Sequence, residues 1–176
     1  MGDAAPFLIL TGPPGSGKTT AARALVDQWG APAVHLRGDD FWDVIRSGRI
    51  DPWLPQARAQ NATAMTALAR AAKSYRDGGY FTVVDGIVGP WFLDLFRSLD
   101  VPLIYVVLRS DLQTALARIA GRPDQGIVEP SDIAGLHAQF SSLGALERCV
   151  IDVSLLDRPA VVTALRKALA DQRFSL

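Results

Sequence analysis

Cysteine is nearly absent from this sequence, and its scarcity excludes two kinds of structure. The single residue, Cys149, leaves no pair for an internal disulfide and no cluster for a thiolate metal site. Such sparse use of cysteine is typical of proteins in the reducing cytosol. Long apolar runs are lacking as well, since none approaches the ~20 residues that span a bilayer, and the N-terminus has no basic stretch that would begin a signal peptide. We therefore expect a soluble cytoplasmic protein with no membrane partner.

The sequence also lacks an excess of either charge. Its 18 lysine and arginine residues are balanced by 18 aspartate and glutamate residues. Because binding to a nucleic-acid backbone relies on clustered positive charge, we expect no nucleic-acid partner. Only three of the basic residues are lysines, Lys18, Lys73 and Lys167, so a lysine at a special position is easily recognised. A chain of 176 residues is long enough to bury a substantial core, and we expect one domain over residues 1–176.

Short runs rich in β-branched and aromatic residues alternate with longer stretches of helical periodicity. The predicted strands are Phe7–Leu10, Ala33–Leu36, Phe81–Val84, Leu103–Leu108 and Val150–Val153. The predicted helices are Thr19–Gln28, Pro55–Arg76, Pro90–Leu99, Leu112–Ala120, Asp132–Phe140 and Pro159–Asp171. Ser110 and Gln113 predict a capping box at the start of the fourth helix. The alternation predicts an α/β domain whose parallel sheet is covered by helices on both faces and binds ligands at the carboxyl ends of its strands.

A glycine-rich loop directly follows the first predicted strand. It reads GPPGSGKTT and contains a complete G-x-x-x-x-G-K-[ST] pattern. The glycines allow backbone N–H groups to point at phosphate oxygens, and the following helix adds its positive N-terminal end. Lys18 can reach the β- and γ-phosphates, and the Thr19 hydroxyl can ligate Mg²⁺. The expected nucleotide-binding residues of this phosphate loop are Gly12, Pro13, Pro14, Gly15, Ser16, Gly17, Lys18, Thr19 and Thr20.

Two common classes of nucleotide-binding protein do not fit the rest of the chain. A GTPase would need an Asn-Lys-x-Asp guanine reader, but the only asparagine is Asn61, which Ala62 follows. A ring-forming mechanical ATPase usually has a longer chain and a second helical domain. A small kinase fits, because there the loop holds the donor and a short lid closes over it.

The sequence resembles the small P-loop kinases and phosphotransferases, a group that includes shikimate and gluconate kinases, chloramphenicol phosphotransferase, zeta-toxin-like kinases and bacterial kinases of the AAA-33 type. The matching pieces are GPPGSGKTT, GDDFW after the second strand, VVDG after the third and RIAGRP after the helix that follows the fourth. The resemblance implies a three-layer fold with a five-stranded parallel sheet in the order 2-3-1-4-5, and ATP with Mg²⁺ as the donor complex. It does not identify the acceptor, because the acceptor pocket differs among members of the group.

Asp85 ends the apolar run of the third strand, as a Walker B aspartate does. In the implied strand order it would lie beside the phosphate loop, where a carboxylate can hold Mg²⁺ directly or through water. An aspartate that merely caps the turn into the next helix is the alternative. Asp85 also belongs to the expected acceptor side, and which of Asp39 and Asp85 is the base stays open.

Asp39 and Asp40 follow the second strand, one position further out in the implied sheet. In the resembled kinases an aspartate at this position accepts the proton of the acceptor hydroxyl, and Asp39 with Phe41 matches that pattern better than Asp40 does. Asp40 would then be a helix-start residue favoured by the helix dipole, or a second acceptor contact. The alternative for the pair is an ordinary N-cap before a helix over Phe41–Ser47.

The stretch from about residue 121 to residue 130 is polar and contains glycine and proline, as the lid of a small kinase does. By resemblance, Arg118 would stack on the adenine and Arg122 would reach the phosphates and neutralise charge on the transferring group. A solvated helix end is the alternative, and Arg109 after the fourth strand is a third candidate. His35 and His137 give no convincing base or metal site, and we expect each to be packed or exposed.

Three tryptophans fall in or beside the loops that follow the second and third strands, where an acceptor would bind. Trp42, Trp53 and Trp91 could form an apolar pocket to which Arg46 and Asn61 add polar groups, or they could belong to the core. We expect an ATP-dependent kinase that transfers phosphate to a hydroxyl of a metabolite or an antibiotic-like molecule. A nucleoside or nucleotide kinase and a non-catalytic switch or partner-dependent ATPase remain the alternatives.

Overall fold

The computed structural model describes residues 5–121 and 130–176. Its centre is one sheet of five strands, β1 (Phe7–Thr11), β2 (Ala33–Arg37), β3 (Phe81–Asp85), β4 (Ile104–Arg109) and β5 (Val150–Asp152). All neighbouring strands run parallel in the order β2-β3-β1-β4-β5. The implied strand order is therefore confirmed.

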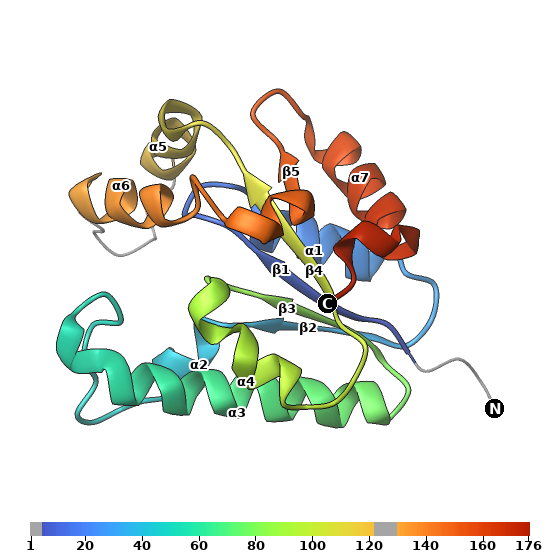
Figure 1. The fold of residues 1–176 in the computed structure, drawn as a ribbon, viewed down its shortest axis with the longest axis horizontal. Helices are drawn as coiled ribbons and strands as arrows, with labels where there is room; N and C mark the ends of the chain where they lie inside the picture. Colours follow the sequence, from blue (N-terminus) through green and yellow to red (C-terminus); the bar gives the residue numbers. More distant parts are fainter. Residues whose placement is uncertain (1–4, 122–129) are drawn as a thin grey trace.

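Helices cover both faces of the sheet (Figure 1). On one face α1 (Lys18–Asp27) packs against α7 (Arg158–Ala170), and on the other α3 (Arg58–Asp77) packs against α4 (Leu93–Arg97). The helices α2 (Asp40–Asp43), α5 (Leu112–Ala120) and α6 (Pro130–Gln139) lie toward the end of the molecule at which the strands finish. Four 3₁₀ turns complete the described elements: η1 (Pro55–Ala57), η2 (Pro90–Phe92), η3 (Gly144–Cys149) and η4 (Gln172–Phe174).

The core lies between the sheet and these two helical layers. Every residue of β1 and β3 is buried, which explains why both strands read as continuous apolar runs. The parallel register sets Leu10 of β1 opposite Asp85 of β3. This register brings the end of β3 beside the start of the phosphate loop. None of the helices in the described ranges combines the length and the hydrophobicity needed to cross a bilayer.

Two local expectations were wrong. The helix after β4 is capped by Asp111, whose carboxylate accepts a hydrogen bond from the Thr114 N–H at 2.8 Å, and not by Ser110. The Ser110 side chain is buried instead, so the capping box does not form. The helix after β2 ends at Asp43 rather than at Ser47, which leaves an irregular segment between α2 and α3.

Candidate active site

The phosphate loop has a conformation that only glycine can adopt at key positions. Gly12, Gly15 and Gly17 have φ angles of 142°, 77° and 90°, in the left-handed region. A Cβ atom on Gly12 would lie 2.0 Å from the carbonyl oxygen of Leu108, and one on Gly15 would lie 2.5 Å from that of Ala115. The motif therefore specifies both the shape of the loop and its close packing against β4 and α5.

Lys18 and Thr19 stand at the start of α1, where backbone N–H groups have no partner within the helix. The Lys18 ammonium group donates a hydrogen bond to the carbonyl oxygen of Pro13 at 3.1 Å, so its side chain folds back over the loop. The buried Ser16 hydroxyl has no hydrogen-bond partner within the described residues. A loop of this shape at a helix N-terminus suits the binding of a phosphate chain.

Asp85 is buried at the end of β3, with 3% of its surface exposed. Its Oδ2 atom lies 3.3 Å from Nε2 of His35, whereas its Oδ1 atom has no hydrogen-bond partner in the described part of the chain. A buried carboxylate oxygen without a partner is costly unless a ligand completes it. Together with the Thr19 hydroxyl at the loop it provides hard oxygen ligands of the kind that Mg²⁺ prefers, and one carboxylate suffices because phosphate and water supply the others. These residues therefore fit the implied metal.

Asp39 is brought beside Asp85 by a close approach of the two strand ends. The Gly38 N–H donates to the Asp85 carbonyl oxygen at 2.6 Å, and a Cβ on Gly38 would lie 3.2 Å from that oxygen. Partial burial raises the pKa of the Asp39 carboxyl above 3.8, the positive charge of Lys18 opposes this shift, and the negative charge of Asp85 adds to it. Because the residue is still open to solvent, the shift is limited by screening. Asp39, Asp85 and Lys18 thus belong to one electrostatic site.

The geometry of Asp39 and Asp40 does not support an ordinary helix cap. Asp39 occupies the N-cap position of α2, but its side chain makes no capping hydrogen bond. The four residues of α2 also leave little helix to stabilise. Asp40 lies 3.3 Å from Arg37 in an exposed ion pair, which accounts for its charge without an acceptor. Asp39, in contrast, interacts electrostatically with Lys18 and Asp85.

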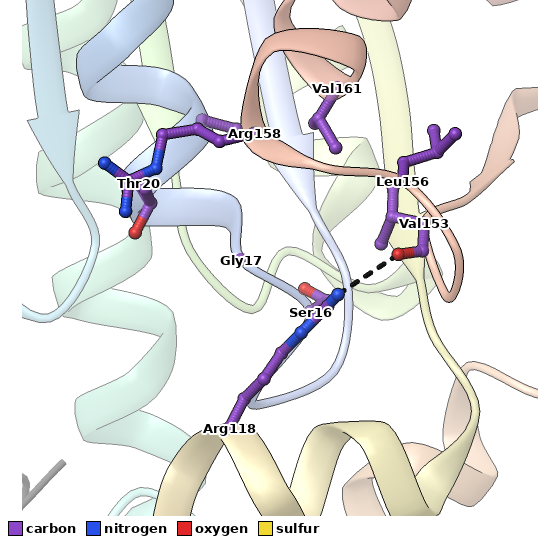
Figure 2. Close-up of a pocket in the computed structure, with 9 residues that line it drawn as sticks. Ser16, Gly17, Thr20, Arg118, Val153, Leu156, Arg158 and Val161 are labelled. Atoms are coloured by element: carbon purple, nitrogen blue, oxygen red, sulfur yellow. Dashed lines mark hydrogen bonds between the residues drawn. The ribbon is translucent and has the colours of Figure 1, made fainter. Parts of the chain in front are cut away.

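A cavity of about 240 Å³ opens beside the phosphate loop (Figure 2). Its lining residues are Ser16, Gly17, Thr20, Ala21, Arg118, Val153, Leu156, Arg158 and Val161. Arg118 reaches past the loop and donates a hydrogen bond to the carbonyl oxygen of Val153 at 3.2 Å. Arg118 thus lines the same cavity as Ser16 and Thr20, and its stacking on an adenine stays a prediction. The size and position of the cavity suit the base and ribose of a nucleotide whose phosphates occupy the loop.

Sequence reasoning missed Arg158, the first residue of α7, which lines the same cavity. The sequence feature that could have identified it is its position at the start of the helix that follows the fifth strand, because ligands bind at the carboxyl edge of such a sheet. Arg122 and most of the expected lid lie outside the described residues. The guanidinium group of Arg109 makes two hydrogen bonds to Glu147, at 3.0 and 3.1 Å, so internal contacts engage it.

The expected acceptor residues divide between the core and the surface. Trp42 is only 8% exposed and packs in the core, whereas Trp53 and Trp91 are 47% and 48% exposed. Arg46 is exposed as well, on the irregular segment after α2. Trp91 also packs edge-on against Phe140, with ring centroids 5.9 Å apart. Trp42 therefore packs in the core, whereas Trp53 and Trp91 present exposed aromatic surface, and their contact with an acceptor stays a prediction.

Two polar side chains of α3 hold the segment that carries Trp53. Gln60 bonds to both the N–H and the carbonyl oxygen of Ile50, at 2.9 and 2.6 Å. Asn61 accepts from the Trp42 indole N–H at 2.8 Å and donates to the Pro52 carbonyl oxygen at 2.7 Å. Asn61 is thus used for internal support, not as a free polar group of the acceptor pocket.

Solved structures share this fold over almost their whole length. The fold matches a sugar kinase from Janibacter sp. HTCC2649 with a TM-score of 0.70, 20% identity, and coverage of 94% of this chain and 95% of that one. It matches an APS kinase of Mycobacterium tuberculosis, solved with AMPPNP and APS, with a TM-score of 0.67, 18% identity and coverage of 96% and 99%. A tunicamycin resistance protein of Deinococcus radiodurans matches with a TM-score of 0.69, 16% identity and 94% coverage of each chain.

No curated protein matches the chain in sequence. The sequence model of the AAA_33 family, described as an AAA domain, matches residues 7–143, from the first residue of β1 to beyond α6. The matched region contains the phosphate loop, Asp39, Asp85 and Arg118. The chain has the fold of the small P-loop kinases and belongs to the AAA_33 family.

Proposed function

We propose that the protein is an ATP-dependent phosphotransferase that transfers the γ-phosphate to a hydroxyl group of a small molecule. The observation that carries this proposal is the meeting of Lys18, Asp39 and Asp85 at the carboxyl edge of β1, β2 and β3. A loop that binds only the nucleotide needs Lys18 and Asp85. A kinase needs in addition an acidic side chain that can receive the proton of the acceptor hydroxyl, and Asp39 is the candidate for this role.

In the proposed reaction the phosphate loop binds the ATP phosphates through its N–H groups and through Lys18. Thr19 and Asp85 would hold Mg²⁺, which neutralises negative charge on the phosphates when bound. The acceptor oxygen attacks the γ-phosphorus, the bond to the β-phosphate oxygen breaks, and ADP leaves. Asp39 accepts the hydroxyl proton, and its raised pKa makes its ionised form a better proton acceptor.

Exposed apolar side chains on the segments that follow β2 and β3 favour an acceptor with an apolar body. Val44, Trp53 and Leu54 are 70%, 47% and 41% exposed on the segment between α2 and α3, and Trp91 is exposed on the turn after β3. Aromatic and aliphatic surface with few polar contacts is typical of sites for metabolites or drug-sized molecules. The tunicamycin resistance protein and the sugar kinase show that proteins of this fold include ones linked to both kinds of compound.

An acceptor screen tests the proposal. Purified protein is incubated with ATP, Mg²⁺ and pools of small hydroxyl compounds, and each pool is assayed for ADP and, by mass spectrometry, for a product heavier by one phosphoryl group. We expect at least one pool to give both signals together. Slow release of ADP and inorganic phosphate in every pool, with no phosphorylated compound, would instead indicate an ATPase or a switch.

A further inference from the structure

His35 is a nearly buried histidine that contacts the proposed metal-binding aspartate. It lies in the middle of β2, one of the two edge strands of the described sheet, and only 12% of its side chain is exposed. Its Nε2 atom lies 3.3 Å from Oδ2 of Asp85 on β3. Because a carboxylate can only accept, the imidazole Nε2–H is the donor in this hydrogen bond. The phosphoryl transfer proposed above gives this histidine no role.

The strand register explains how the two side chains meet. His35 pairs with Val83, and Asp85 is two residues further along β3. Side chains alternate along a strand, so Phe81, Val83 and Asp85 share one face of the sheet with His35. Trp29, just beyond the end of α1, stacks on Phe81 with ring centroids 3.8 Å apart. This face is therefore the one that α1 covers, and α1 begins at Lys18 of the phosphate loop.

The two carboxylate oxygens of Asp85 differ in their hydrogen bonding. Oδ2 is engaged by His35, and Oδ1 has no hydrogen-bond partner among the described residues. A single hydrogen bond to Oδ2 restricts rotation of the carboxylate and so holds Oδ1 in one place. A ligand atom that is already oriented binds more tightly, because ordering it costs nothing at the moment of binding.

We propose that His35 is a positioning residue for Asp85, which orients the free Oδ1 atom toward the divalent cation of the metal–nucleotide complex. The inference rests on the proposed function, because it takes a nucleotide with its cation as the ligand of this site. It adds a residue from the middle of β2 to a proposed site whose other members lie on the phosphate loop, at the start of α1 and at the ends of β2 and β3. Partners of this kind, which hydrogen-bond a metal ligand, typically contribute about 10- to 100-fold in metal affinity or activity.

A binding experiment separates this role from simple packing. The affinity of the protein for a non-hydrolysable ATP analogue is measured by calorimetry, once in EDTA and once in excess Mg²⁺. The ratio of the dissociation constant in EDTA to the one in Mg²⁺ gives the factor by which the metal tightens binding. It is compared among the unmodified protein, His35→Phe and His35→Gln, because glutamine can present an N–H donor at the reach of Nε2 and phenylalanine cannot.

We expect His35→Phe to lower this ratio about tenfold and to leave the affinity in EDTA unchanged, with His35→Gln within about threefold of the unmodified protein. Asp85→Asn alone should also lower the ratio. Adding His35→Phe to Asp85→Asn should not lower the ratio further, since the histidine acts through that carboxylate. Thermal unfolding of each variant checks folding. If His35→Phe does not fold, His35→Met takes its place, because methionine adapts to irregular spaces and has no N–H donor.

Equal metal contributions in the unmodified protein and in His35→Phe would overturn the inference and leave the proposed function standing. So would a loss of thermal stability in His35→Phe without a change in the ratio, which is what a packing role predicts. Failure of the unmodified protein to bind the analogue in either buffer would overturn the proposed function itself, and the inference with it.

Discussion

Replacing Asn61 by alanine removes the side chain that ties the acceptor-side segment to α3. The change leaves the Trp42 indole N–H, which now donates to Asn61 at 2.8 Å, inside the core without an acceptor. An unsatisfied buried donor costs about 1–3 kcal/mol, and the lost bond to the Pro52 carbonyl oxygen adds about 0.5–1.5 kcal/mol. The free energy of unfolding should therefore fall by about 1.5–4.5 kcal/mol, which lowers the melting temperature by roughly 5–15 °C in a chain of this size.

Urea unfolding and thermal unfolding of Asn61→Ala measure this loss. Thr63→Ala is the matched control, because Thr63 is an exposed residue of the same helix whose hydroxyl, among the described residues, bonds only to the Ala59 carbonyl oxygen. Its substitution should change stability by less than about 0.5 kcal/mol. Once an acceptor is known, Asn61→Ala should also raise the acceptor KM while ATP affinity stays the same. A loss no larger than that of the control would refute the reasoning, since it would mean that water satisfies the indole N–H once Asn61 is gone.

Three further results are expected. Gly12→Ala places a Cβ 2.0 Å from the Leu108 carbonyl oxygen, so nucleotide binding measured by calorimetry should weaken by more than about tenfold; near-normal binding would contradict the described loop. Arg118→Ala removes a wall of the cavity beside the loop and should raise the dissociation constant of ATP about three- to tenfold, with little change in the melting temperature. Asp39→Asn should increase the free energy of unfolding at neutral pH, because the raised pKa of Asp39 means that folding disfavours its charged form. That gain should shrink as the pH falls through the folded pKa and vanish below 3.8, where the carboxyl is protonated in both states; a gain that grows on acidification would show the opposite shift.

The phosphate loop and the sheet were predictable because their sequence signals are local. Glycine is required at positions 12 and 15 by contacts that no other residue tolerates, so the motif predicts its own conformation. The buried strands of a parallel sheet are mostly apolar on both faces, and β1 and β3 are so up to the polar residues that end them, with Thr82 as the one interruption. Asp85 followed from the same logic, because it ends an apolar strand that the implied order places beside the loop.

Other features depend on contacts between distant segments, and single-sequence reasoning missed them. His35 contacts Asp85 only because the register of β2 on β3 sets the two side chains on one face. Trp42 is buried on the short helix α2, and its indole N–H donates to Asn61 on α3, a contact between segments that are distant in sequence. The capping residue after β4 was misplaced by one position, because Ser110 and Asp111 are both good N-cap residues and burial of the serine decides between them.

The most direct test of the central claim compares two neighbouring aspartates in phosphoryl transfer. Transfer from ATP to an acceptor found in the screen is measured by product mass for the unmodified protein, Asp39→Asn and Asp40→Asn, with ATP affinity determined in parallel. We expect Asp39→Asn to lower kcat by about 10²- to 10⁴-fold with ATP affinity nearly unchanged, as the loss of a general base does. Asp40→Asn, which removes only an exposed ion pair with Arg37, should stay within about threefold of the unmodified protein. Near-normal transfer by Asp39→Asn would contradict the account.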